Sequence, residues 1–324
     1  MGAEACARHR VPAVTAVRSI QAPTQAPIPL SAWAAWAAVC FFWGTTYLAI
    51  RIGIRTLPPA LFAGLRFVAA GLILGGICRA CGLRYPNRKE WAPLTIIGFL
   101  LLVLGNGGVV AAERWVDSGL TALVLSMLPI WMALLNALTG GGERLTLRGA
   151  AGLALGMGGV ALLVYHPGGG SPEPAAHRAL GILILEGASI CWAGGSLYGK
   201  RFSPPVAPLM GAAAQMLAGG LILCGIGTAA GEWSRLHFDA SGFGSLIYLM
   251  IFGSLVGYGS FVFALSRMPA TTVSLYAYVN PVVALLCGLF ILHEPLSLAK
   301  LAAAGVILGG VALAQSGVRH RTRV

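Results

Sequence analysis

The stretch that decides the fold is YAYVNPVVALLCGLFILHEPLS, residues 276–297. It runs from a proline through an apolar segment to a glutamate followed closely by Leu-Ser. A bilayer core is roughly 30 Å thick, which takes about 20 helical residues to cross, so this stretch is typical of a membrane span. Residues 124–146, VLSMLPIWMALLNALTGGGERLT, follow the same plan and end on Leu-Thr. The chain therefore contains a membrane-spanning unit twice.

Composition places the whole chain in the membrane. Of 324 residues, 57% are hydrophobic and 10% are charged, whereas charged residues make up about a quarter of a soluble protein. Backbone polar groups cannot stay unpaired in lipid, and the apolar runs lack the alternation of barrel strands, so the spans should be helices. The sequence thus predicts an all-α integral membrane protein with ten transmembrane helices, at 32–53, 58–79, 92–112, 117–139, 149–165, 179–199, 205–229, 242–265, 269–292 and 299–317.

The ten expected spans form two copies of five. GMGGVALL at 156–163 matches ILGGVALA at 307–314, Pro129 matches Pro281, and Glu143 matches Glu294, at an offset of roughly 150 residues. Since five is odd, the second copy must enter the membrane with the opposite orientation. Inverted repeats of this kind recur among secondary transporters, whose substrate site lies near the midplane between the halves.

Several segments resemble the two EamA-type repeats of the drug/metabolite transporter superfamily. They are FFWGTTYLAIR, PPALFAGLRFVAAGLIL, AAERWVDSGLTALVLSMLPIWMALL, NPVVALLCGLFILHEPLS and AAGVILGGVAL. The resemblance implies ten helices, cytoplasmic termini, a central cavity, and export or uptake of small metabolites such as amino acids or amphipathic compounds. The expected organisation is a flexible cytoplasmic tail at 1–30, repeats at 31–166 and 179–317, and a basic cytoplasmic tail at 318–324.

The positive charge acts as an orientation signal. The net charge is +12, and with the N-terminus in the cytoplasm fifteen Lys and Arg residues fall on the cytoplasmic side against six outside, with Arg66 left in a span. Such a bias places both termini in the cytoplasm. We therefore expect a multi-pass protein of the plasma membrane, the bacterial inner membrane, whose partners are the lipid bilayer and a small-molecule substrate and not nucleic acid.

Aromatic and polar residues inside the spans are candidates for a substrate site. Trp43 and Tyr47 are four residues apart and share a helix face, as do Tyr276 and Asn280. Trp192 is the approximate repeat mate of Trp43, so the two can flank one cavity. The sequence predicts that these five residues bind substrate, although helix packing would also explain either tryptophan.

The paired prolines predict helix kinks. A proline inside a helix removes one N–H and leaves the carbonyl four residues earlier unpaired. For Pro129 and Pro281 these are the carbonyls of Leu125 and Ala277. Irregular backbone at membrane depth must face protein or water, so both should point to the interior. A kink without a ligand remains the alternative.

Small residues predict close helix packing. The G-x-x-x-G pattern lets two membrane helices approach each other closely. It occurs at Gly71/Gly75, Gly152/Gly156, Gly253/Gly257 and Gly305/Gly309.

Two charges, Arg66 and Glu186, interrupt the second and sixth spans. They lie about eight and seven residues into parallel spans, hence at similar depth. A charge so placed usually faces the interior and pairs. We expect Arg66 and Glu186 to pair directly or to share a hydrated vestibule, with an outward-reaching Arg66 and a protonated Glu186 as the alternative. Glu186 is the expected carrier if transport is coupled to protons.

Other classes lack their motifs. The sequence has no H-E-x-x-H, no G-x-S-x-G and no nucleotide-binding G-x-x-x-x-G-K-[S/T], so no catalytic residues, no cofactor and no direct use of ATP are expected. Cys78 and Cys81 form a lone C-x-x-C without the second pair that a zinc site needs. The expected function is that of a secondary transporter, with export as the preferred direction. A multispanning enzyme or a lipid-handling protein is the alternative, and the substrate, coupling ion and oligomeric state, a homodimer included, stay open.

Overall fold

The computed structural model describes residues 28–139, 143–144, 147–165, 174–291, 297–316 and 319–320. Within these residues the protein is a helical bundle, and eight of its helices are long and apolar enough to cross a membrane. Two further helices of 19 residues, α7 (Leu147–Tyr165) and α14 (Leu298–Ser316), occupy the places of the fifth and tenth expected spans. The expected first tail up to residue 27, Glu294 and most of the last tail lie outside the described residues.

The helices of the first half begin and end within a few residues of the expected spans. The first two are single helices, and the third and fourth are divided. They are α1 (Leu30–Gly53), α2 (Pro59–Ala80), α3 (Arg88–Gly98) with the π-helix η1 (Phe99–Asn106) and α4 (Gly107–Ala112), α5 (Ser118–Leu125) with α6 (Leu128–Leu138), and α7 (Leu147–Tyr165).

The second half repeats this order with one added 3-10 turn. Its elements are α8 (Ala175–Phe202), α9 (Pro208–Ala229), the 3-10 helix η2 (Glu232–Arg235), α10 (Ala240–Tyr248) with the π-helix η3 (Leu249–Tyr258) and α11 (Gly259–Arg267), α12 (Ala270–Val273) with α13 (Tyr276–Ile291), and α14 (Leu298–Ser316). A two-residue antiparallel pairing joins β1 (Glu143–Arg144), which lies between α6 and α7, to β2 (Arg319–His320), which follows α14.

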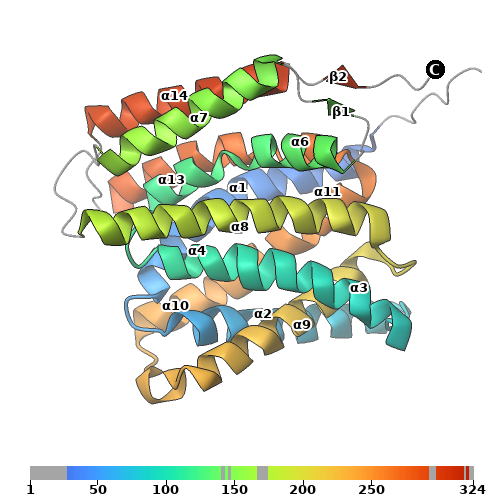
Figure 1. The fold of residues 1–324 in the computed structure, drawn as a ribbon. Helices are drawn as coiled ribbons and strands as arrows, with labels where there is room; N and C mark the ends of the chain where they lie inside the picture. The colour runs from blue at the N-terminus through green and yellow to red at the C-terminus, as the bar shows by residue number, and fades with distance from the viewer. Residues whose placement is uncertain are drawn as a thin grey trace, which may run out of the picture.

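Corresponding helices of the two halves run in opposite directions. In Figure 1 the third span runs from α3 on the right to α4 on the left, whereas its counterpart runs from α10 on the left to α11 on the right. The connections that precede α3 and follow α8 lie at one end of the bundle, and those that follow α4 and α9 lie at the other. The expected inversion of the repeats is therefore present.

The halves meet through two pairs of equivalent helices, α2 with α9 and α7 with α14. A Cβ built on Gly71 would lie 3.0 Å from the Ala213 carbonyl, and one on Gly220 would lie 3.0 Å from the Gly64 carbonyl. Gly71 and Gly220 hold the same place, thirteenth, in their helices. Each half therefore offers the other the same surface.

The second helix pair packs in the same reciprocal way. A Cβ on Gly159 would meet the Ile307 nitrogen at 3.0 Å, and one on Gly310 would meet the Gly156 nitrogen at 2.5 Å. Close approach at Gly71 and Gly156 agrees with the G-x-x-x-G expectation. It is wrong for Gly305 and Gly309, where an added Cβ would meet nothing within 4 Å. Gly310 makes the contact because its side of α14 faces α7.

The two proline-containing spans break at different places. In the first half the helix ends at Leu125 and resumes at Leu128, so Pro129 sits in the first turn of α6, where its missing N–H costs little. In the second half the break follows Val273, and Pro281 lies inside α13. The kink predicted at Pro129 is thus a full break just before it. For Pro281 the break, at Ser274 and Leu275, lies less than one turn before the predicted position at the Ala277 carbonyl.

Candidate functional site

A cavity lies at the centre of the bundle, between the two halves. It offers about 70 Å³ to the centres of water-sized molecules, which is several times what one buried water needs. Its wall draws on α1, α2, η1, α4, α5, α6, α8, η3 and α13. The lining residues with polar or aromatic side chains are Trp43, Thr46, Tyr47, Arg66, Phe67, Asn106, Ser189, Trp192, Tyr258, Tyr276 and Asn280.

Aromatic rings from three spans meet at Trp43. Its ring centroid lies 5.3 Å from that of Trp192 and 5.0 Å from that of Tyr276, both edge to face. The Trp43 Nε1–H donates to the Gly253 carbonyl at 3.0 Å, within the π-helix η3. Edge-to-face contacts at these distances are favourable and fix the ring planes. The sequence expectation that Trp43 and Trp192 flank one cavity from two sides agrees with this placement.

Asn280 joins α13 to α1 beside the aromatic rings. With its amide nitrogen turned toward them, the side chain donates to the Cys40 carbonyl at 3.1 Å and to the Tyr276 carbonyl at 3.2 Å. The Tyr47 hydroxyl is its hydrogen-bond partner on the other side. Asn280 is only 1% exposed. Its polar atoms are therefore largely committed to holding the two helices together at the cavity wall.

All five residues predicted to bind substrate line the cavity. Trp43, Tyr47, Trp192, Tyr276 and Asn280 come from three spans and both halves, and the structure brings them together. Their role in binding stays a prediction. The residues before the prolines whose carbonyls lose a helical partner, Leu125 and Ala277, also line the cavity, as expected.

Arg66 reaches the same cavity from α2. Its Nη2 donates to Asn106 Oδ1, the last residue of η1, and its guanidinium carbon lies 4.2 Å from the centroid of the Phe67 ring. The side chain is buried, at 3% exposure, and its Nε–H has no hydrogen-bond partner within the described part of the chain. Arg66 therefore faces inward, and it does not reach outward past the membrane surface.

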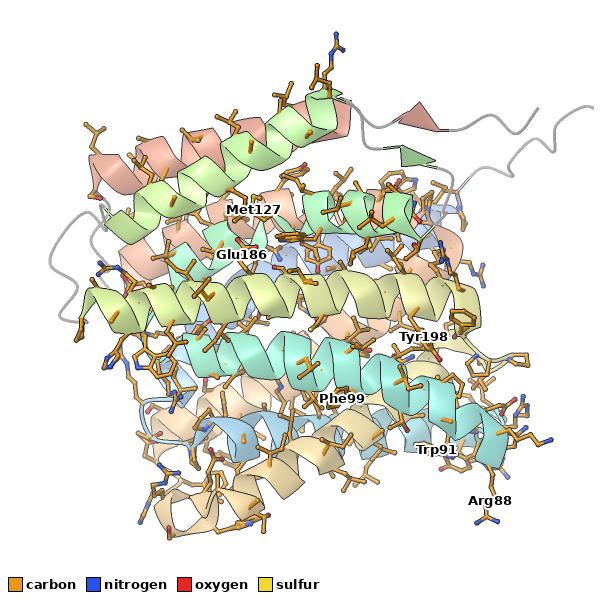
Figure 2. The ribbon with its side chains drawn as sticks, in the orientation of Figure 1. Arg88, Trp91, Phe99, Met127, Glu186 and Tyr198 are labelled. Atoms are coloured by element: carbon orange, nitrogen blue, oxygen red, sulfur yellow. The ribbon has the colours of Figure 1, made fainter. Side chains whose placement is uncertain are left out.

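Glu186 lies near the cavity without lining it. Its Oε2 accepts a hydrogen bond of 2.7 Å from the Trp131 indole, and Figure 2 shows Glu186 on the side of α8 that faces α6. The direct Arg66–Glu186 pair is not formed, because η1 presents Asn106 to Arg66 and α6 presents Trp131 to Glu186. Arg66 and Glu186 were expected to pair because they lie at equal depth in the membrane. Depth does not specify the direction in which a side chain points around its helix.

Asn106 and Tyr258 are site residues that sequence reasoning missed. Asn106 ends η1 and Tyr258 ends η3, and both line the cavity. The Tyr258 hydroxyl donates to Gln215 Oε1 at 2.7 Å. A lone asparagine in the apolar run LLLVLGNGGVV was the available signal for Asn106.

At the end of the bundle formed by the 113–117 connection, Arg51 lies 3.8 Å from Asp117. The Arg51 guanidinium also donates to the Glu113 backbone carbonyl. These contacts attach the end of α1 to the connection between the third and fourth spans.

Comparisons with known proteins fit this architecture. The family model described as "EamA-like transporter family" matches residues 31–165 and 179–315. A relative named "Uncharacterized inner membrane transporter YedA" from Escherichia coli (strain K12) is 37% identical over 284 residues, covering 86% of this chain and 89% of that protein. A "Probable amino-acid metabolite efflux pump" from the same strain is 28% identical over 302 residues, covering 88% and 95%.

A solved crystal structure supports the fold independently. It superposes with a TM-score of 0.65 at 22% identity and covers 88% of this chain and 98% of its own. At that identity it supports the fold alone. Together with the family match over both repeats, the described cavity and the apolar helices, the comparisons establish that the chain belongs to the EamA-like transporter family and is a multi-pass membrane transporter, not an enzyme.

Proposed function

We propose that the protein is a secondary transporter that exports small metabolites by alternating access. The observation that carries this proposal is the central cavity, whose wall is built from both inverted halves. Two similar halves of opposite orientation can adopt two similar conformations, each open to one side of the membrane. The relative named as an amino-acid metabolite efflux pump supports the direction and the size of the solute.

The cavity favours a zwitterionic or uncharged amphipathic solute. Trp43, Trp192 and Tyr276 offer aromatic faces and edges, which suit an apolar side chain or an ammonium group. The Asn280 side chain and the backbone carbonyls near Pro281 offer polar groups at one wall. A few convergent polar groups in an otherwise apolar pocket are what orients a small ligand.

A flux assay in sealed vesicles tests the proposal. Trp192→Ala and Asn280→Ala should each reduce uptake of a transported amino acid per amount of folded protein. Asn280→Ala should also lower the folded yield, because Asn280 holds α13 to α1. Trp33→Ala is the matched control, because Trp33 is 41% exposed on the outside of α1. If both cavity variants transport at the original rate, the substrate site lies elsewhere. If the wild type moves no solute, the transport proposal itself is wrong.

The proposed orientation has both termini in the cytoplasm of a bacterial inner membrane. Expected cytoplasmic loops are 80–91, 140–148 and 200–204, and expected outer loops are 113–117, 166–178 and 230–240. In a cysteine-free background, an impermeant thiol reagent should label Ser234→Cys from outside and not Lys89→Cys. Both positions are exposed and lie at opposite ends of the bundle. Labelling of Lys89→Cys and not of Ser234→Cys from outside would show that the orientation is the opposite of the one proposed.

A further inference from the structure

Arg66 is a buried cation whose recorded contacts are all neutral. The guanidinium donates to the Asn106 amide oxygen and lies over the Phe67 ring. Among the described residues the ion pairs are Arg51–Asp117 and Arg84–Glu90, and Glu186 is bonded to Trp131. A charge held within a membrane span is costly unless an opposite charge, or water in a cavity, compensates it.

The Arg66 Nε–H and the Ser189 hydroxyl, on α8, are donors on the cavity wall that have no acceptor among the described residues. The Arg66 side chain is 97% removed from solvent. Both residues line the cavity. Buried donors without partners are rare and costly in folded proteins, so a ligand that supplies oxygen acceptors would complete this wall.

The other half of the protein shows what a purely structural residue at this place looks like. Gln215 is eighth in α9, as Arg66 is eighth in α2. It accepts a hydrogen bond from Tyr258, it is neutral, and it does not line the cavity. A neutral amide is thus sufficient to join the second span of a half to the end of its π-helix. The charge on Arg66 exceeds that structural requirement.

We propose that the cavity selects solutes that carry a carboxylate, and that Arg66 binds this group. The planar guanidinium matches a carboxylate in shape and charge. The aromatic rings around Trp43 then take the apolar part of the same solute. This inference rests on the proposed function, since it names the class of solute that the cavity accepts, and Arg66 is its specificity-determining residue.

Matched probes test the inference by binding. The aromatic set shares one phenyl ring: phenylalanine and 3-phenylpropionate carry a carboxylate, whereas phenylalanine carboxamide and phenethylamine do not. The aliphatic set consists of leucine, which carries a carboxylate, and of leucinamide and isoamylamine, which do not. Binding is followed by thermal stabilisation of the purified protein. We expect carboxylates to bind the wild type about tenfold or more tightly than their carboxamides, the usual effect of one charge-assisted hydrogen bond.

The variants separate a specific contact from general damage. Arg66→Gln installs the residue of the other half and should abolish the preference for carboxylates, while Arg66→Lys should retain part of it. Gln215→Ala is the matched control, because it removes a buried hydrogen bond at the equivalent place and should keep the preference. Melting without ligand reports the folded state of each variant.

Several results would overturn the inference. One is a preference for carboxylates that Arg66→Gln retains, and another is equal binding of carboxylates and carboxamides by the wild type. The others are failure of every carboxylate in both sets to bind, and stabilisation of the protein by chloride in a way that added carboxylates do not reduce. Flux of the same probes into vesicles distinguishes the two proposals. Selective binding without flux would refute transport alone, and flux without selectivity would refute the role of Arg66 alone.

Discussion

The two halves of the protein solve one structural problem with different chemistry. In each half a polar side chain at the eighth place of the second span bonds to the last residue of the π-helix in the third span. The first half uses Arg66 and Asn106, and the second uses Gln215 and Tyr258. The positions are conserved between the copies while the charge is found in one of them.

The difference teaches which features belong to the scaffold. Helix order, the π-helical segments and the glycine contacts occur in both halves. Arg66 lines the cavity and Gln215 does not. A feature present in one half and directed at the cavity is a candidate for function, and a feature present in both is a candidate for architecture.

The largest expected effect concerns the shared architecture. Gly220→Leu and Gly310→Leu should each abolish the folded yield, because even a Cβ would lie 2.7 Å from the Val68 nitrogen and 2.5 Å from the Gly156 nitrogen. Size-exclusion chromatography of the detergent-solubilised protein measures this.

Neighbouring glycines provide the controls. Gly225→Leu and Gly309→Leu place the same side chain on the same helices where nothing lies within 4 Å. They should fold at a yield near that of the wild type. Equal yields for contact and control variants would show that the two helix pairs do not hold the halves together.

The two polar pairs should differ in cost when one partner is removed. Asn106→Leu takes the recorded hydrogen-bond acceptor from a buried cation, and Gln215→Leu takes one from the neutral Tyr258 hydroxyl. We expect losses of about 1–3 kcal/mol for Gln215→Leu and more for Asn106→Leu, measured as shifts in melting temperature. Adding Tyr258→Phe to Gln215→Leu should restore most of the loss. No restoration would mean that the hydroxyl is satisfied by another group.

The separate partners of Arg66 and Glu186 predict independent effects on stability. The double variant of Arg66→Gln and Glu186→Gln should change stability by the sum of the two single changes within about 0.5 kcal/mol, as is usual for residues without a shared partner. Trp131→Phe should couple to Glu186→Gln and not to Arg66→Gln, because Trp131 donates to Glu186. A double variant that recovers the yield lost by each single one would indicate a direct ion pair in another conformation.

The smallest expected effect lies at the caps of the third spans. Asn87 caps α3, and Asp239 caps α10. Hydrogen bonds from the Ser241 and Thr56 hydroxyls and from the Gly242 N–H lower the pKa of Asp239 to about 2. Since this pKa is below that of the unfolded chain, ionised Asp239 stabilises the fold above about pH 4, and the contribution is lost as the pH falls toward 2.

Asp239→Asn makes the second cap resemble the first and tests this pH dependence. It should lower the melting temperature slightly at pH 7, and the difference from the wild type should vanish as the pH approaches 2. Asn87→Ala removes an uncharged cap. Its loss of melting temperature should therefore contain no contribution from ionisation of the capping side chain. A pH-independent difference for Asp239→Asn would assign the effect to geometry and not to charge.

The sequence predicted the helices well and the contacts between them less well. Apolar runs fixed the spans to within a few residues, and helical spacing placed Tyr276 and Asn280 on the inward face. The Gln215–Tyr258 and Arg66–Asn106 bonds join helices, and no local pattern specifies how two helices are rotated against each other. The break after Val273 also lacks a local signal, because the nearest proline is more than one turn away.

The reciprocal glycine contacts have a consequence for how such a chain could arise. In an isologous interface, as in a two-fold dimer, the same surface occurs on both partners: if residue i of one contacts residue j of the other, then residue j of the first contacts residue i of the second. Here the partners are α2 with α9 and α7 with α14 of one chain. A half-length protein with this surface could bury it only against a copy inserted upside down, which demands nearly balanced positive charge at both ends. Fusion into one chain removes that demand, and each half is then free to acquire its own charge.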